Sequence, residues 1–217
     1  KRRWEWSEMS YNRKLPMEII EKYPNKPWNW NWISENPNIT MEIIKNNPDK
    51  NWKWHHISRN PNLTLKMIKN YENKDWNWYF VFMNSNIPIE ILEEKFNNHC
   101  NGYSISNNSN ITLEFISKYP NKIWNWFVIS KNKNITWEII QNNPNKPWNW
   151  YGVSLNPNIN LEIVKANLDK GWNWNLLSKN PNITWNHILN NLEFPWDLGY
   201  FSQNINITKE IINQSVN

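Results

Sequence analysis

A Trp-x-Trp triplet recurs along the chain at intervals of 24 residues or twice that, beginning with Trp4-Glu5-Trp6. The missing copy is present in degenerate form at Cys100-Asn101-Gly102, and nine units of 24 make up 216 of the 217 residues. Low-complexity sequence does not keep such a phase, whereas a stack of identical structural units must. The chain is therefore a tandem repeat protein. The other triplets begin at Trp28, Trp52, Trp76, Trp124, Trp148, Trp172 and, as Trp-Asp-Leu, Trp196.

The abundant asparagines occupy fixed positions within these units. Asparagine-rich tracts are often disordered or prone to aggregate. Here, counting the first Trp of each unit as position 0, position 8 is Asn in every unit, and position 10 is Asn in all but the first. A hydrophobic content of 39% with 18 Trp residues can bury a core if the units stack. The position-8 residues are Asn12, Asn36, Asn60, Asn84, Asn108, Asn132, Asn156, Asn180 and Asn204.

Each unit contains a segment typical of a short capped helix, such as residues 39–48. Thr40 is a good N-cap, and Glu42 in the first turn interacts favourably with the helix dipole. Ile39 and Ile44 stand at the two positions of a hydrophobic staple, and Pro48 ends the helix. Equivalent caps are expected at Thr64, Thr112, Thr136, Thr184 and Thr208, with Pro16 and Pro88 replacing the cap elsewhere.

The Trp segment predicts a second helix that starts at the first Trp, because Pro27 precedes it where proline is tolerated. Trp30 and Ile33 are three residues apart and share a face, so we expect the second Trp of each unit to be interior. Pro37 ends this helix, and Asn36 can form an Asx turn. Helices of about seven or eight residues are unstable alone. We therefore predict an all-α fold: a solenoid, or superhelix, of nine two-helix repeats forming a single array over residues 1–217.

The phrase "NPNITMEIIKNNPDK" resembles the helical half of leucine-rich-variant repeats, which are also 24 residues long. That resemblance implies a right-handed superhelix of alternating α and 3₁₀ helices, although Trp-x-Trp replaces a Val-Arg segment of that pattern. The fuller phrase "NKNITWEIIQNNPNKPWNW" at residues 132–150, in which Lys133 stands where other repeats have Pro, is more similar to Trp-rich repeats of uncharacterised giant DNA virus proteins, and this resemblance covers the whole chain. Neither family supplies a catalytic residue.

The residues that could carry chemistry are few. His55 and His56 are neighbours and point in different directions on a helix, which is poor geometry for one metal ion. His99-Cys100 has no second Cys beside it, and His187 stands alone. Serine at position 6 recurs in eight units, which is typical of a packing position rather than of a nucleophile. We expect no catalytic residues, no metal, no cofactor and no small-molecule substrate.

The unit near residues 97–120 departs most from the pattern. Cys100 and Gly102 replace two Trp side chains, and glycine weakens a helix, so we expect this to be the least stable part of the array. The single Cys indicates a reducing compartment, and we expect no secretion. The chain also begins in mid-unit without Met, which indicates a fragment of a longer chain. No segment is apolar for the roughly 18 residues that a membrane span needs.

Positions 3 and 4 of the units vary in sequence but stay rich in aromatic residues. A repeat protein separates a repeated framework from a varied surface, and aromatic residues are enriched at binding hot spots. These positions are therefore either a contact surface for a partner or packing between successive units. The candidate partner-binding residues are Trp32, His55, His56, Tyr79, Phe80, Tyr103, Phe127, Tyr151 and Tyr200.

A lysine recurs at position 22, just before the next Trp triplet. With a net charge of +5, such a stripe permits binding of nucleic acid, with aromatic rings stacking on bases. A solvated lysine before a helix is the simpler interpretation, and 19 acidic residues dilute the positive field. The stripe comprises Lys26, Lys50, Lys74, Lys122, Lys146 and Lys170.

Taken together, these patterns favour a non-enzymatic scaffold for protein–protein interaction, of viral origin and located in the host cytoplasm or the virion. A solenoid that binds single-stranded nucleic acid is the alternative, and a structural virion component is a third possibility. The sequence does not identify the protein partner.

Overall fold

The computed structural model describes residues 4–90, 92, 93, 95 and 102–215. These residues form short helices and no strand, so the predicted all-α class is confirmed. The chain divides into two compact units, residues 1–108 and residues 109–217. Whether the repeats continue as one array across that division stays a prediction.

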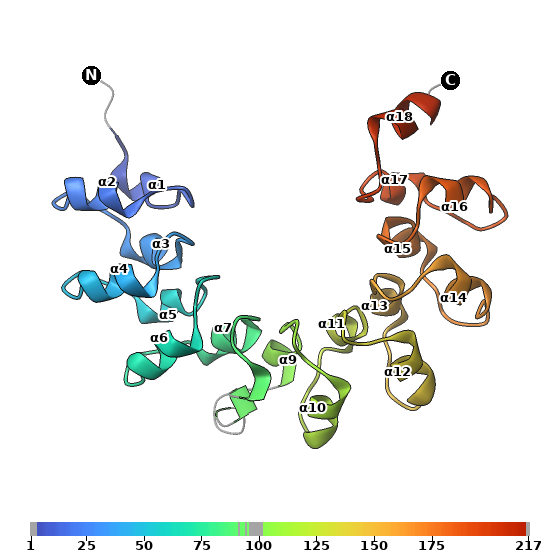
Figure 1. Ribbon diagram of the computed structural model, residues 1–217, viewed down its shortest axis with the longest axis horizontal. Coiled ribbons are helices and arrows are strands. Elements are labelled where there is room, and N and C mark those ends of the chain that lie inside the picture. The colour runs from blue at the N-terminus through green and yellow to red at the C-terminus, as the bar shows by residue number, and fades with distance from the viewer. Residues whose placement is uncertain (1–3, 91, 94, 96–101, 216–217) are drawn as a thin grey trace. The chain divides into compact units, whose positions relative to one another are not determined.

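Within each unit the helices alternate between two rows (Figure 1). The helices of the Trp row contact one another in sequence, α3 with α5 and α7 with α9 in the first unit, and α11 with α13, α13 with α15 and α15 with α17 in the second. The Trp row comprises α1 (Trp6–Met9), α3 (Trp30–Glu35), α5 (Trp54–Ile57), α7 (Trp78–Met83), α9 (Gly102–Ile105), α11 (Trp126–Ser130), α13 (Trp150–Ser154), α15 (Trp174–Lys179) and α17 (Leu198–Phe201). The Thr row comprises α2 (Met17–Lys22), α4 (Met41–Asn46), α6 (Leu65–Asn70), α10 (Leu113–Lys118), α12 (Trp137–Asn142), α14 (Leu161–Lys165), α16 (Trp185–Leu189) and α18 (Lys209–Ser215).

The Thr-row helices begin as the sequence predicts. The Thr40 hydroxyl accepts a hydrogen bond from the Ile43 amide over 3.4 Å, and both residues of the predicted staple, Ile39 and Ile44, are buried. In one repeat Asn160 replaces the Thr, and its side chain caps α14. The same bond is made by Thr64, Thr112, Thr136, Thr184 and Thr208.

The Trp-row helices begin two residues later than predicted, at the second Trp instead of the first. Asn29 is the N-cap of α3, in extended conformation, and its side chain accepts a hydrogen bond from the Asn31 amide over 3.1 Å. Trp28 therefore precedes the helix. The predicted start was wrong because Asn29 can accept hydrogen bonds from the free amides of the first turn and so fixes the start of the helix. Pro27, which is only tolerated at a helix start, has no such effect. The helices are also shorter than expected, with four to six residues in each Trp-row helix and five or six in each Thr-row helix except α18, which has seven.

This shift changes which Trp is interior in four repeats, where Trp28, Trp52, Trp76 and Trp172 are 6–9% exposed. Trp124, Trp148 and Trp196 are half-buried, as are the residues predicted to be interior: Trp30, Trp54, Trp78, Trp126, Trp150 and Trp174. The first Trp also donates its indole N–H to a main-chain oxygen five residues earlier, at the end of the preceding helix, over 2.7–3.1 Å. An N–H bonded in this way makes full burial of an indole possible.

The second Trp of one repeat packs edge-to-face against the first Trp of the next repeat. Trp54 and Trp76, for example, have ring centroids 5.1 Å apart at 77°. Such a pair contributes about 0.5 to 1.5 kcal/mol beyond the area that it buries. The same arrangement, with centroids 5.0–5.3 Å apart, occurs at Trp6–Trp28, Trp30–Trp52, Trp126–Trp148, Trp150–Trp172 and Trp174–Trp196.

The position-8 asparagines join each repeat to the one before it. Asn156 accepts a hydrogen bond from the Asn158 amide over 2.8 Å, which is the predicted Asx turn. Its side-chain nitrogen also donates to the main-chain oxygens of Ser130, Asn132 and Ile135, at 2.7, 3.1 and 2.9 Å. Bonds to the residue 24 earlier recur at Asn36, Asn60, Asn84, Asn108, Asn180 and Asn204.

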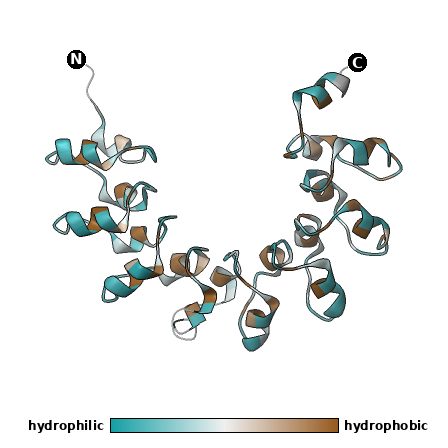
Figure 2. Cartoon of the chain, in the orientation of Figure 1, coloured by the Kyte–Doolittle hydropathy of each residue, from teal (hydrophilic) through white to brown (hydrophobic). Residues whose placement is uncertain are grey.

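The position-6 serines make a second link between repeats, as their predicted packing role requires. The buried Ser154 hydroxyl donates to the Trp150 oxygen over 2.8 Å and accepts from the Asn173 amide of the next repeat over 2.9 Å. Hydrophobic residues lie where neighbouring helices meet, and hydrophilic residues follow the turns (Figure 2). The Trp-row core is formed by position 5: Ile33, Ile57, Val81, Ile105, Ile129, Val153, Leu177 and Phe201.

The unit predicted to be the least stable lies partly outside the described residues. His99, Cys100 and Asn101 belong to that gap, so the prediction stays untested, and α9 begins directly after it at Gly102. Among the described residues, no helix is both long and apolar enough to cross a membrane.

Candidate partner-binding surface

The aromatic side chains at position 3 are exposed on the Trp row. Each is the second residue of its helix, and exposure reaches 42% at Tyr79, 46% at Tyr103 and 59% at Tyr151. Phe127 is 36% exposed, and His55 is also exposed. His55 and Asn77 are within hydrogen-bonding distance through their side chains, at 3.0 Å. We call His55, Tyr79 and Tyr103 of the first unit, with Phe127 and Tyr151 of the second, the position-3 residues.

The side chains at position 4 instead reach the preceding repeat, where they contact the residue at position 7. Trp32 packs edge-to-face on Tyr11, with ring centroids 4.7 Å apart. The His56 Nδ1 lies 2.7 Å from a carboxylate oxygen of Glu35. These positions therefore serve packing between repeats, one of the two interpretations that the sequence left open.

The next repeat continues this pattern of contacts. The Arg59 guanidinium lies over the Phe80 ring, 4.2 Å from its centroid, and also bonds Glu35 over 3.0 Å. A cation held over an aromatic face contributes about 0.5 to 1 kcal/mol at an exposed site. Phe80 also packs edge-to-face against Tyr79 at 5.2 Å, so it supports a position-3 residue.

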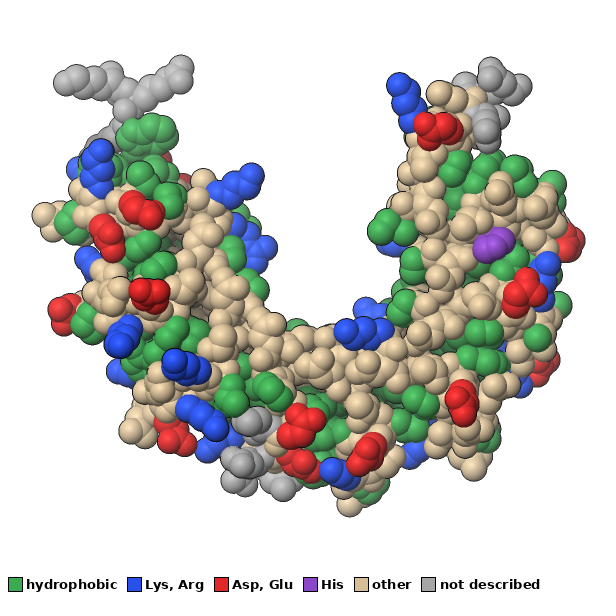
Figure 3. Space-filling view, in the orientation of Figure 1, with side chains coloured by type: hydrophobic (Ala, Val, Ile, Leu, Met, Phe, Trp, Pro, Cys, Tyr) green, Lys and Arg blue, Asp and Glu red, His purple; other side chains and the backbone are tan. Residues whose placement is uncertain are grey.

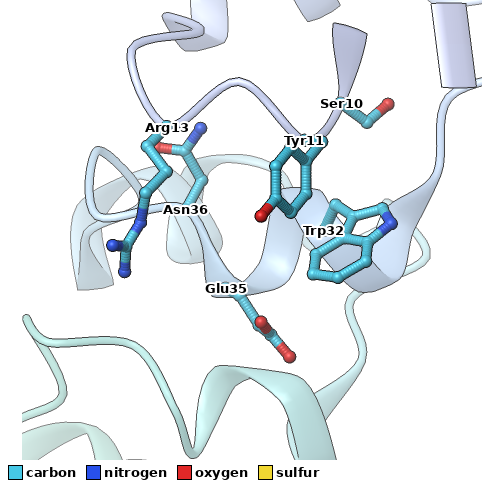
Figure 4. A pocket seen from close by; sticks show the side chains of 6 residues that line it. All are labelled: Ser10, Tyr11, Arg13, Trp32, Glu35 and Asn36. Carbon is cyan, nitrogen blue, oxygen red and sulfur yellow. The ribbon is translucent and has the colours of Figure 1, made fainter. Parts of the chain in front are cut away.

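Small hollows lie beside these contacts. One, of about 240 Å³, is lined by Ser10, Tyr11, Arg13, Trp32, Glu35 and Asn36 (Figure 4). Figure 4 shows the Tyr11 and Trp32 rings side by side with Glu35 below them. The equivalent hollow two repeats on, of about 410 Å³, includes Arg59 and Phe80. Both are open, and neither holds a constellation suited to catalysis among its described residues.

In other repeats position 4 has a smaller or a more exposed side chain. Gly152 lies so close to α11 that a Cβ would stand 2.3 Å from the Phe127 main-chain oxygen. Ser104 is buried at the same position of α9, whereas Tyr200 of α17 is 38% exposed. The residues predicted at position 3 are thus exposed, whereas those at position 4 contact the preceding repeat at Trp32, His56 and Phe80. Position 4 is not fully covered, because Trp32 remains 41% exposed.

The position-22 lysines lie near the Trp pairs. The Lys26 and Lys74 ammonium groups lie 5.5 and 5.6 Å from the ring centroids of Trp6 and Trp54. Lys170 forms an ion pair of 2.8 Å with Asp169, and this hydrogen bond lowers the pKa of the Asp169 carboxyl. Basic and acidic side chains are interspersed on the face in view in Figure 3. On that face the lysines therefore do not form a continuous field of one sign.

The described histidines have structural partners. His187 Nδ1 accepts a hydrogen bond from the Thr184 amide over 3.2 Å and completes a capping box at α16. The rings of His55 and His56 are 5.7 Å apart. In the described ranges, no three His, Cys, Asp or Glu side chains come together as a metal site would require. His99 and Cys100 lie outside those ranges.

Sequence reasoning missed the role of position 7. Tyr11, Glu35 and Arg59 stand there in successive repeats, and each matches the chemistry of the position-4 residue of the following repeat. Pairing these two positions across units could have revealed the contact. Comparison of the chain with family models, curated proteins and solved structures finds no match.

Proposed function

We propose that this protein is a non-enzymatic scaffold that binds a protein partner through the position-3 residues. The supporting observation is their exposure: Tyr79, Tyr103, Phe127 and Tyr151 are 36–59% exposed, although the helices beneath them are held by other residues. Large aromatic side chains left in solvent at equivalent places of successive repeats are typical of binding surfaces. Helices pack about 8 to 10 Å apart, so neighbouring position-3 residues within one compact unit offer regularly spaced anchors.

The chemistry of these residues favours protein over nucleic acid as the partner. Phenols and rings supply apolar area with a hydrogen-bonding group, and His55 is the only position-3 residue here that can carry a positive charge. Binding of nucleic acid depends chiefly on lysine and arginine contacts to phosphate. Single-stranded nucleic acid on the position-22 lysines is the alternative, and a structural role in a virion is the third.

The proposed origin and location have a different basis. The Trp-rich repeats resemble those of giant DNA virus proteins, and that resemblance alone supports a viral origin and a place in the host cytoplasm or the virion. The described contacts among the repeats are compatible with any source.

The test is capture of partners from lysate by the immobilised chain, with and without nuclease. We expect nuclease-resistant capture by the wild-type chain and its loss when Tyr79, Tyr103, Phe127 and Tyr151 are all changed to Ser. The matched control changes four exposed aliphatic residues elsewhere to Ser: Ile123, Leu168, Leu192 and Ile205. Unchanged capture by the tyrosine and phenylalanine variant, or capture that nuclease abolishes, would refute the proposal.

A further inference from the structure

The same groove occurs twice, once in each compact unit, between the ends of two successive repeats. The first copy has a volume of about 360 Å³ and is lined by Ile44, Pro48, Lys50, Trp52, Trp54 and Lys74, among others. The second, of about 540 Å³, has Ile140, Pro144, Lys146, Trp148, Trp150 and Lys170 in the equivalent places 96 residues later. We call these the first and second Trp–Lys grooves. They are distinct from the position-3 residues, none of which lines either groove.

One Trp in the wall of each groove has an indole N–H that bonds no partner among the described residues. Trp52 and Trp148 donate their indole N–H groups to main-chain oxygens at 2.8 Å. Trp54 and Trp150, by contrast, donate to no partner within the described part of the chain, and both are half-buried. Their rings are held in place by edge-to-face contacts with Trp76 and Trp172 at 5.1 Å. A rigid indole with a free N–H is suited to bind a carbonyl group of an incoming chain.

The charges in the two grooves have one sign. Two lysines line each groove, and no carboxylate is among the lining residues. Lys74 lies over the Trp54 ring, and Lys170 is paired at the rim with Asp169, whose side chain is 71% exposed. An anionic ligand can replace such an exposed partner at little cost, because surface ion pairs contribute little stability.

The arrangement of the rings argues against stacked bases. Lys74 and Trp76 both contact the Trp54 ring, and Trp137 and Trp172 both contact the Trp150 ring at steep angles of 62° and 81°. A base needs an open aromatic face. An extended peptide needs only a notch between rings and a donor for its carbonyls, which is how aromatic grooves bind proline-containing segments in the polyproline II conformation.

We propose that the two Trp–Lys grooves bind an extended acidic peptide that contains proline. Its prolines pack against the indole walls, one carbonyl accepts from the free Trp54 or Trp150 N–H, and its carboxylates pair with the lysines. This proposal does not rest on the proposed function, because the two surfaces have no residue in common.

The probe is a fluorescein-labelled peptide of repeated Pro-Glu-Pro triplets, followed by fluorescence anisotropy with the full chain. We expect binding that weakens with added salt, about fivefold weaker binding when Trp54 and Trp150 are both changed to Phe, and a larger loss when Lys50, Lys74, Lys146 and Lys170 are changed to Gln. The Phe change keeps an aromatic ring at the site and removes the N–H donor with part of the indole. The control for charge changes Lys66, Lys133, Lys165 and Lys209, which are exposed outside both grooves, to Gln.

Two further peptides and one oligonucleotide complete the test. Peptides with Lys in place of Glu, or Ala in place of Pro, should bind at least about tenfold more weakly than the probe, since each lacks one of the two features that the grooves recognise. Equal binding of all three peptides, equal effects of the groove and control lysine variants, or tighter binding of oligo(dT) than of the probe would each overturn the proposal. Loss of partner capture in the position-3 variant with probe binding intact would confirm that the surfaces are separate.

Discussion

The side-chain amide of Asn60 donates a hydrogen bond to the main-chain oxygen of Asn36, 24 residues earlier, over 2.8 Å. The side-chain amide of Asn36 in turn donates to the main-chain oxygen of Asn12 at 3.1 Å. Such bonds register successive repeats within each compact unit, and a change of spacing would leave the buried Asn60 side-chain amide without its acceptors, the Asn36 and Ile39 oxygens. An unpaired buried group costs about 1 to 3 kcal/mol. This cost explains physically why the period is held at 24 residues without an insertion.

The first prediction tests this link through Asn180, whose side-chain nitrogen donates to the Ser154 and Asn156 oxygens at 2.9 and 3.0 Å. Asn180→Asp keeps the acceptor for the Asn182 amide but turns a second oxygen toward two carbonyl oxygens. We expect a loss of about 3 to 5 kcal/mol in the free energy of unfolding at neutral pH, as for an unpaired buried charge.

The loss should depend on pH in a defined direction. Burial beside carbonyl oxygens raises the folded-state pKa of the new carboxyl above its unfolded value of about 3.9. The destabilisation is therefore smallest below about pH 4 and grows as pH rises toward the folded-state pKa. Urea unfolding of variant and wild type at several pH values measures this difference. A difference that does not change with pH would contradict the prediction.

The caps and turns of each repeat could be predicted because they depend on residues close in sequence. Thr40 and Asn36 bond amides two or three residues away, and those bonds are present. The bonds between repeats could not be derived in the same way, since the donor of Asn60 and its acceptor meet only after two repeats have packed. The sequence alone likewise could not show which of positions 3 and 4 packs between repeats, because position 4 contacts position 7 of the preceding repeat only in the folded protein.

The second prediction separates the two Trp residues of a repeat. Trp52→Phe removes the indole N–H that bonds the Asn47 oxygen at 2.8 Å, whereas Trp54→Phe removes an N–H that has no partner among the described residues. Both changes remove the same atoms. We expect Trp52→Phe to cost about 1 kcal/mol more than Trp54→Phe in chemical denaturation, the usual net worth of one hydrogen bond. Equal losses would mean that the Trp52 bond contributes nothing to stability.

The third prediction concerns the close approach of α13 to α11. A Cβ at residue 152 would stand 2.3 Å from the Phe127 main-chain oxygen and 3.0 Å from the Ser130 Cβ, so Gly152→Ala forces the helices apart. We expect a loss of about 1 to 3 kcal/mol, the usual cost of overpacking, although alanine is the better helix former. Gly199→Ala is the control, because its Cβ would meet no main-chain atom, only the side-chain Oδ1 of Asp197 at 3.1 Å, which caps α17. A lower melting temperature for the control than for Gly152→Ala would refute the assignment.

The last prediction asks whether positions 3 and 4 differ as the contacts require. Tyr151 is 59% exposed, so Tyr151→Ser should change the free energy of unfolding by less than about 0.5 kcal/mol. The Phe80 ring centroid lies 4.2 Å from the Arg59 guanidinium and 5.2 Å from the Tyr79 ring centroid. Phe80→Ser should therefore lower the free energy of unfolding by about 1 to 2 kcal/mol. A double-mutant cycle of Arg59→Ala with Phe80→Ser should then give a coupling energy of about 0.5 to 1 kcal/mol. If Tyr151→Ser instead unfolds the second unit, the position-3 residues are part of the packing framework, and the surface proposed to bind a partner is not free to do so.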